Sequence, residues 1–276
     1  MTNHVLIACS KAKTHDPTNE LVWSVGLTIE EWGNRWSSDS LPRFEARELY
    51  AGRATRQQLD IVEGTPDSVA YVVSAGAGLL GTSTGEVIPS YESTFGRGGP
   101  SVEDWHRLPL GGLSRIDLDE GDRVIAFAPR NYLRAVASDP ELGRFANRMV
   151  AAAGSALGGV CGLPVNIHPR AKEVLGVASA DLNTELIRIF LEDGASGIEG
   201  VSAEAESLPP LPVRRRVDDE ELLRIVEESH RGKTGAELVR YVRDVLSVRA
   251  SVERIGAARR IVSSDRDLGL RETGSD

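Results

Sequence analysis

The feature that most constrains the fold of this chain is a set of four short apolar runs, each of which ends abruptly at a polar loop. The runs span residues 4–9, 68–74, 123–128 and 163–167. Runs of this length are typical of strands that are buried on both faces of a sheet. Helical patterns follow them, at residues 43–62, 142–157 and 183–191. Because strands alternate with helices, we expect an α/β fold, namely a three-layer α/β/α sandwich with a mostly parallel central sheet.

The chain changes character at residue 196, where small and acidic residues lead into the sequence LPPLP. This composition predicts a linker over residues 196–216, after an α/β domain of residues 1–195. Three further helical patterns predict a small C-terminal helical unit over residues 217–262. Residues 263–276 have little to bury and are expected to form a flexible tail.

The composition narrows the function classes. The 276 residues carry a net charge of −9, which argues against nonspecific coating of nucleic acid, because such binding depends on neutralising phosphates. A local basic cleft remains compatible with this charge. The two cysteines, Cys9 and Cys161, give neither a disulfide framework nor metal-ligand spacing, and their apolar surroundings favour core positions. With no apolar run long enough for a membrane span or a leader, we expect a cytoplasmic protein without metal or cofactor.

In parallel sheets, ligands bind beyond the carboxyl ends of the strands, so the loops there are candidate sites. The loop after the first run contains Ser10, Lys11, Lys13 and Asp16. Serine and lysine are suitable donors to a phosphate or sugar, and a carboxylate can face a reacting carbon. The glycines of a P-loop are missing. An ordinary solvated surface loop would have the same composition.

The loop after the second run is rich in glycine and extends over residues 74–94. Glu86 and Glu92 are candidate bases for activating water, and Tyr91 is a candidate for stacking on a nucleobase. Glycines allow the backbone to approach a ligand closely, and residues 76–85 could make room for a bulky base. A wide loop with a purely structural role explains the same pattern.

The third and fourth runs are also followed by polar side chains. Arg130 and Asn131 follow the third run; the amide can read a base edge or cap a helix. His168 and Arg170 follow the fourth run, on either side of a proline. An imidazole there can stabilise a departing anion, although a lone histidine is often structural.

Four stretches carry a resemblance to a known family: CSKAK at residues 9–13, ARELYAGR at 46–53, VVSAGAGLLGTSTGEVIPSYEST at 72–94 and NIHPR at 166–170. The first three resemble a poorly characterised bacterial family with a CSK, ARELY, SAxxGLL and YxxT pattern, which is similar to the uracil-DNA glycosylase-like superfamily. The fourth resembles the second motif of that superfamily. The likeness covers residues 1–194.

The resemblance implies a DNA glycosylase that flips a modified base out of DNA and hydrolyses its N-glycosidic bond, leaving an abasic site. Glucosylated 5-hydroxymethylcytosine in phage DNA is one candidate substrate, which would imply a role in anti-phage defence. By position, Asp16 would be the carboxylate of the water-activating loop, Asn131 would read the base and His168 would face the leaving group. The first loop lacks the Gly-Gln-Asp-Pro-Tyr order of the best-known branch, and the late turn reads His-Pro-Arg rather than His-Pro-Ser.

Base excision needs a carboxylate near the cationic sugar and donors near the departing base. We therefore expect one acid among Asp16, Glu86 and Glu92 to act together with His168 or Asn131. Lys11 and Lys13 are expected to hold phosphate rather than attack the sugar, which predicts a monofunctional enzyme.

Two other functions fit the sequence. One is a nucleoside or nucleotide N-glycosidase or transferase that uses the same sheet edge. The other is a non-catalytic DNA-binding stress or regulatory protein, in which residues 235–262 form a helix-turn-helix. Its second helix would present Arg249, Arg254, Arg259 and Arg260.

Overall fold

The computed structural model describes residues 1–38, 40–96, 98–210 and 214–272, with side chains as far as residue 264. The chain divides into two compact units, Met1–Leu208 (unit 1) and Pro209–Asp276 (unit 2), and each is described by itself. Each unit has its own hydrophobic core. No helix within the described ranges combines the length and the apolar character needed to cross a bilayer.

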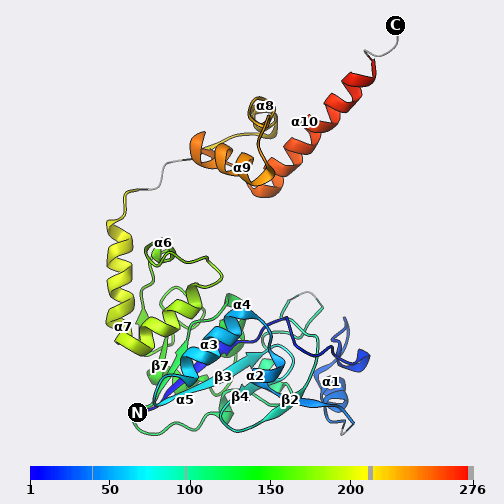
Figure 1. Cartoon of the computed structure of the whole chain (residues 1–276). Coiled ribbons are helices and arrows are strands. Elements are labelled where there is room, and N and C mark those ends of the chain that lie inside the picture. The colour runs from blue at the N-terminus through cyan, green and yellow to red at the C-terminus, as the bar shows by residue number, and fades with distance from the viewer. Residues whose placement is uncertain (39, 97, 211–213, 273–276) are drawn as a thin grey trace. The chain divides into compact units, whose positions relative to one another are not determined.

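Unit 1 is built on a six-stranded sheet with the order β4-β3-β1-β6-β7-β8 (Figure 1). Its strands are β1 (Asn3–Ala8), β3 (Ser68–Ser74), β4 (Gly78–Gly81), β6 (Arg123–Ala126), β7 (Met149–Ala152) and β8 (Leu163–Val165). Only the pairing of β4 with β3 is antiparallel; all other pairs are parallel. The expected mostly parallel central sheet is therefore confirmed, and all four apolar runs form strands in it.

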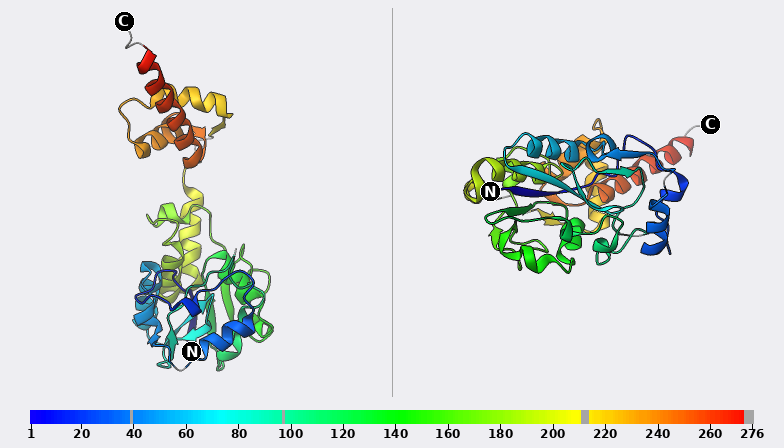
Figure 2. Two further views of the ribbon diagram at one scale, coloured as in Figure 1. Left: turned by 90° about the vertical axis from the view of Figure 1, so that its right-hand side faces the viewer. Right: turned by 90° about the horizontal axis from the view of Figure 1, so that it is seen from below.

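Helices cover this sheet on both faces. The helices of unit 1 are α1 (Ile29–Trp36), α2 (Ala46–Leu49), α3 (Arg53–Glu63), α4 (Arg130–Ala137), α5 (Leu142–Phe145), α6 (Ala171–Val174) and α7 (Leu182–Ser207). The chain moves from β1 to β3 in one direction and from β6 to β7 in the other, so right-handed crossovers put α3 and α4 on opposite faces. Figure 2 shows the resulting layers, and α7 packs beside α3. The α/β/α sandwich is confirmed.

The central strands form because their side chains are apolar on both faces. Val5, Leu6 and Ile7 of β1 are at most 1% exposed. A separate two-stranded sheet pairs β2 (Arg43–Glu45) with β5 (Val87–Pro89). Single 3-10 turns complete unit 1, at Asn19–Leu21, Trp105–Arg107, Leu113–Arg115 and Ala146–Arg148.

Two helical predictions were wrong in part. The expected helix at residues 142–157 stops at α5 and is followed by strand β7, in which Met149, Val150 and Ala151 are fully buried between β6 and β8. Burial in the sheet overrides the helical propensity of the alanines there. The expected helix at residues 43–62 is divided into β2, α2 and α3.

The first part of the expected linker is helical. Helix α7 continues to Ser207 after a kink at Gly194, whose φ of 68° lies in the left-handed region that glycine adopts easily. Ile198 and Ala205 are buried in this second half, which explains why residues 196–207 are ordered as a helix. Residues 211–213 of the expected linker lie outside the described residues.

Unit 2 contains the three helices expected from the sequence. They are α8 (Asp219–Ser229), α9 (Gly235–Arg240), which continues into a π-helical turn (Tyr241–Val245), and α10 (Val252–Glu272). Short strands β9 (Arg215–Arg216) and β10 (Val248–Arg249) pair in parallel. Thr234 and Glu237 form a capping box at the start of α9. Helix α10 thus extends beyond residue 262, where the flexible tail was expected to follow, and residues 273–276 lie outside the described residues.

The arginines proposed to read DNA from unit 2 are partly engaged within that unit. Arg254 donates to Asp219 and to the Val217 carbonyl, and Arg259 donates to the Lys233 carbonyl. Arg249 and Arg260 are exposed.

Candidate functional site

The topology of the sheet singles out one position on its carboxyl edge. Taken in chain order, the five parallel strands have the spatial order 2-1-3-4-5, because β3 lies on one side of β1 and β6 on the other. In doubly wound sheets of this order, ligands bind where the chain reverses its direction of winding. Here this switch point lies between the carboxyl ends of β1 and β6.

The switch point is closed by a contact between Cys9, which follows β1, and Tyr132 of α4. The Cys9 Sγ atom lies 3.4 Å from the Tyr132 hydroxyl, which also lies 3.3 Å from the Cys9 carbonyl oxygen and donates to it. Cys9 is 9% exposed, as expected for a core cysteine. Burial raises the pKa of Tyr132 well above its usual value, so this hydroxyl remains a neutral donor.

A buried chain of three hydroxyl groups lies beside the switch point, on the β3 side. The Ser74 Oγ atom accepts hydrogen bonds from the backbone N–H groups of Gly76 and Ala77, at 3.2 and 2.9 Å. Because both lone pairs of Ser74 are engaged, its hydroxyl proton is donated to Tyr91. Tyr91 in turn donates to Tyr50, at 2.8 Å. Burial raises the pKa of both tyrosines, so the chain of hydroxyls is neutral and fixed in direction.

Lys13 covers this hydroxyl chain. It forms an isolated antiparallel bridge with Tyr50, and its Nζ atom lies 4.1 Å from the centre of the Tyr91 ring and 5.8 Å from that of Tyr50. Loss of solvent lowers the pKa of Lys13, since burial disfavours the charged form. An ammonium group that has lost much of its water is favourably placed to bind an anionic group of a ligand.

The rim of the site is formed by Lys11 and Glu92. The Lys11 Nζ and Glu92 Oε1 atoms are 3.9 Å apart, and both side chains are more than half exposed. Glu92 is held by its backbone, which accepts from Trp23 and donates to Leu21, at 2.8 Å in each case. A cavity of about 330 Å³ is lined in part by Lys11, Trp23, Glu92 and Ser93.

The other predicted residues of the first two loops lie differently. Ser10 is engaged within the protein, where it donates to the Ala12 carbonyl and accepts from Gly52 N–H. Asp16 is exposed, without a hydrogen bond or ion pair to any other described residue. Glu86 follows β4, which leads away from the carboxyl edge, and its carboxylate binds Arg115 at 2.8 Å. Of the three predicted carboxylates, only Glu92 lies beside a predicted lysine.

The interpretation of the glycine-rich segment as a wide pocket is wrong. Gly78–Gly81 is the fully buried strand β4, so this segment lies in the sheet. At Gly76, a Cβ atom would be 2.5 Å from the Tyr91 ring, so the glycine is needed for packing against that ring. Tyr91 itself is 1% exposed and lies between Lys13 and Trp36, so its ring offers no free face to a base.

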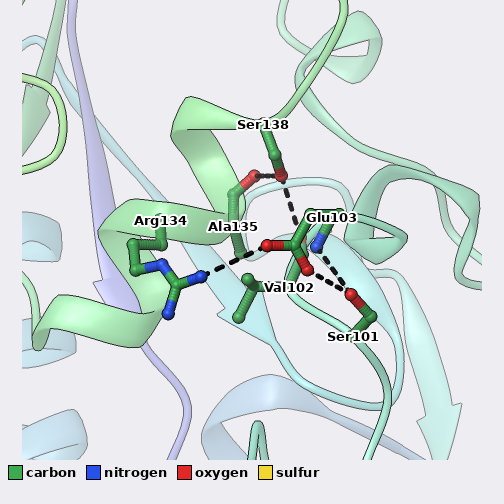
Figure 3. Close-up of polar contacts among 6 residues, drawn as sticks. All are labelled: Ser101, Val102, Glu103, Arg134, Ala135 and Ser138. Carbon is green, nitrogen blue, oxygen red and sulfur yellow. Dashed lines mark hydrogen bonds and ion pairs between the residues drawn. The ribbon is translucent and has the colours of Figure 1, made fainter.

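Side-chain hydrogen bonds hold the α4 region against the loop that contains Val102 and Glu103 (Figure 3). Arg134 donates to Glu103 at 3.2 Å, and Ser138 donates to the Val102 carbonyl at 2.8 Å. Arg130 and Asn131 are exposed in the first turn of α4. The N-cap residue is Pro129, so Asn131 does not cap the helix and its amide faces solvent.

The His-Pro turn lies on the same edge but apart from the lysine-bearing loop. His168 Nδ1 accepts from Arg170 N–H at 3.2 Å, so a neutral imidazole carries its proton on Nε2. Arg170 binds Glu173 at 2.8 Å. Since β8 is three strands from β1, the carboxyl ends of these two strands are separated by roughly 14 Å at about 4.8 Å per strand. The structure brings Lys11, Lys13, Tyr91 and Glu92 together, but not His168.

Tyr91 was expected from the sequence, whereas Tyr50, Tyr132 and Trp23 were not. Tyr50 lies within the ARELYAGR stretch, Tyr132 follows the third strand, and Trp23 lies in a segment without periodicity. One sequence signal could have identified Tyr132: it lies directly after a predicted strand, next to a loop that was already a candidate for the site.

Charge is unevenly divided between the two units. Unit 1 has 18 Lys and Arg against 28 Asp and Glu, a net charge of −10, whereas unit 2 has 14 against 13.

The described residues include no group of three or more His, Cys, Asp and Glu side chains able to hold a metal ion. Comparison with family models, curated proteins and solved structures found no match to the chain.

Proposed function

We propose that unit 1 is a DNA glycosylase, which hydrolyses the N-glycosidic bond of a base that has left the DNA stack. The observation that carries this proposal is the Lys11–Glu92 pair at the mouth of the 330 Å³ cavity, beside the partly buried Lys13. A carboxylate beside two cations suits a reaction in which the sugar becomes cationic and the departing base becomes anionic.

In the proposed mechanism, Glu92 removes a proton from the attacking water and stabilises the cationic sugar. Lys11 stabilises the negative charge on the departing base, and Lys13 holds a phosphate of the strand. His168 follows β8, whose carboxyl end is roughly 14 Å from that of β1, and would contact a more distant part of the strand through its Nε2 proton.

The proposal replaces two of the sequence assignments. Glu92 takes the role expected of Asp16, because Asp16 forms no ion pair with any other described residue, and Lys11 takes the role expected of His168 beside the departing base. A glucosylated base remains a possible substrate to test, although the wide glycine-lined pocket that was to hold it is strand β4.

The test is to incubate the full chain with single- and double-stranded DNAs that bear different cytosine and uracil modifications, and to detect released bases by mass spectrometry. We expect release of at least one base, and a loss of kcat of about 10²-fold or more in Glu92→Gln, which removes the proton acceptor. Glu86→Gln is the matched control, because Glu86 binds Arg115 away from the carboxyl edge. Absence of base release from every DNA, or full activity of Glu92→Gln, would contradict the proposal.

The salt dependence of binding gives an independent check. With Lys13 and Arg130 as phosphate contacts, the logarithm of DNA affinity should fall with the logarithm of salt concentration with a slope of roughly −2 or shallower. A slope near −8 would indicate a much larger basic surface than these residues provide.

The second candidate is a nucleoside or nucleotide N-glycosidase. The net charge of −10 on unit 1 favours it, because a small substrate is repelled less than a polyanion. Release of bases from free nucleotides, with none from any DNA, would select this function.

A further inference from the structure

An aromatic residue, Trp23, belongs to the lining of the cavity next to the Lys11–Glu92 pair. Ser93 and Thr94 also line this cavity, which has a volume of about 330 Å³. This volume lies at the small end of the range for small-molecule sites, which suits a single ring system. Trp23 is only partly buried, whereas Trp32, Trp36 and Trp105 are at most 4% exposed.

The backbone that carries Trp23 is held in place. Backbone hydrogen bonds on both sides of Glu92 join it to Leu21 and Trp23, so the two backbone segments that carry Trp23 and Glu92 are fixed relative to one another. The indole of Trp23 contacts that of Trp32, with ring centres 5.0 Å apart. Trp32 is anchored in turn, because its Nε1–H donates to the Gly76 carbonyl at 2.7 Å. Little ordering of Trp23 is therefore needed when a ligand binds, which favours affinity.

The Lys11–Glu92 ion pair leaves room for a ligand at the mouth of the cavity. At 3.9 Å between two exposed side chains, such a pair contributes little to stability, so separating the two groups costs little. The cavity thus combines an aromatic residue in its lining with a cation and an anion. This combination matches a nucleobase attached to its sugar, with the flat ring inside and the glycosidic bond at the opening.

We propose that Trp23 is the base-stacking residue of this protein and that the cavity beside it holds the extruded nucleobase. The proposal rests on the proposed function for the role of the cavity in catalysis, and it names the subsite that function requires. Trp23 replaces Tyr91, whose ring is buried, as the aromatic residue that contacts the base.

Tryptophan fluorescence provides a direct test, since Trp23 is the tryptophan that solvent and ligands reach most easily. The full chain is titrated with a single-stranded 9-mer that carries one central cytosine among abasic sites, and with a 9-mer that is abasic throughout. We expect quenching by the first and none by the second. Trp23→Ala should weaken binding of the cytosine-containing 9-mer about 10-fold or more, measured by calorimetry, because one stacked base is lost.

Two further variants separate stacking from folding. Trp23→Phe retains an aromatic face and should bind the cytosine-containing 9-mer within about 3-fold of the wild type, although the fluorescence change is lost. Tyr241→Ala removes a partly buried ring from unit 2, where Tyr241 contacts Lys233, and should bind like the wild type. Equal affinity of Trp23→Ala and wild type, or equal quenching by both 9-mers, would overturn the proposal.

The binding titration and the base-release assay together distinguish this proposal from the proposed function. If Trp23-dependent binding is seen but no base is released from any DNA, the stacking site stands and the glycosylase function fails. If bases are released and Trp23→Ala releases them at the wild-type kcat/KM, the glycosylase function stands and the stacking site fails.

Discussion

Replacing Tyr91 by phenylalanine tests the direction of the hydroxyl chain that connects Ser74, Tyr91 and Tyr50. The substitution keeps the ring, which is 1% exposed, and removes one oxygen that takes part in two buried hydrogen bonds. Each such bond contributes about 1 kcal/mol net, and a buried donor left without an acceptor costs about 1–3 kcal/mol more. Since Ser74 would lose the acceptor of its proton, we expect a loss of about 3–5 kcal/mol in the free energy of unfolding.

Tyr50→Phe is the matched variant at the other end of the chain. Its hydroxyl accepts from Tyr91, so removing it breaks one hydrogen bond and leaves the Tyr91 proton without an acceptor, at a cost of about 2–4 kcal/mol. Because Tyr91→Phe already removes both that bond and that proton, the double variant should lose about as much as Tyr91→Phe alone, which is about 2–4 kcal/mol less than the sum of the single losses.

Urea unfolding followed by tryptophan fluorescence measures these losses in the full chain. All four tryptophans lie in unit 1, so the signal reports the stability of unit 1 and not that of the helical unit. The reasoning is refuted if Tyr91→Phe unfolds within about 0.5 kcal/mol of the wild type, or if the two substitutions are additive.

Two further substitutions test packing and charge. Gly76→Ala should destabilise unit 1 by about 1–3 kcal/mol in the same unfolding assay, because the added methyl meets the Tyr91 ring at 2.5 Å; Gly33→Ala in α1, with no atom within 4 Å, should stabilise it slightly. Hydrogen bonds from backbone N–H groups and from buried His4 lower the pKa of Asp122 to about 2. The stabilisation this provides, about 2 kcal/mol, is present above pH 4 and lost as the pH falls through 2, so the difference in stability between wild type and Asp122→Asn should shrink over that interval.

The central sheet was predictable because strands that are buried on both faces consist of consecutive apolar residues. A run such as HVLIAC is apolar throughout and short for a helix, which favours a strand buried on both faces. Strand β7 was missed because alanine-rich sequences favour helices locally. Residues 149–152 are extended because they pair with β6 on one side and with β8 on the other. Strand β4 was missed because glycines signal loops when their neighbours in space are unknown.

The candidate site was predictable only as a region. The sequence located Lys11 and Lys13 at a strand end, and the structure places them there. The selection of Glu92 over Asp16 and Glu86 depends on backbone pairing with residues 21–23, which are about 70 positions away in sequence. Long-range pairing of this kind leaves no periodic signal, and the same holds for the contact of Trp23 with Trp32.

The two outermost strands of the sheet affect how the protein behaves at high concentration. At one border, β4 has only four residues, all of them covered by other parts of unit 1. At the other border, β8 has three residues, and the central one is Pro164, which has no N–H to offer an incoming strand. Because neither border presents a long row of unpaired backbone groups, self-assembly by strand addition is disfavoured, and the folded chain should resist fibre formation under crowded conditions.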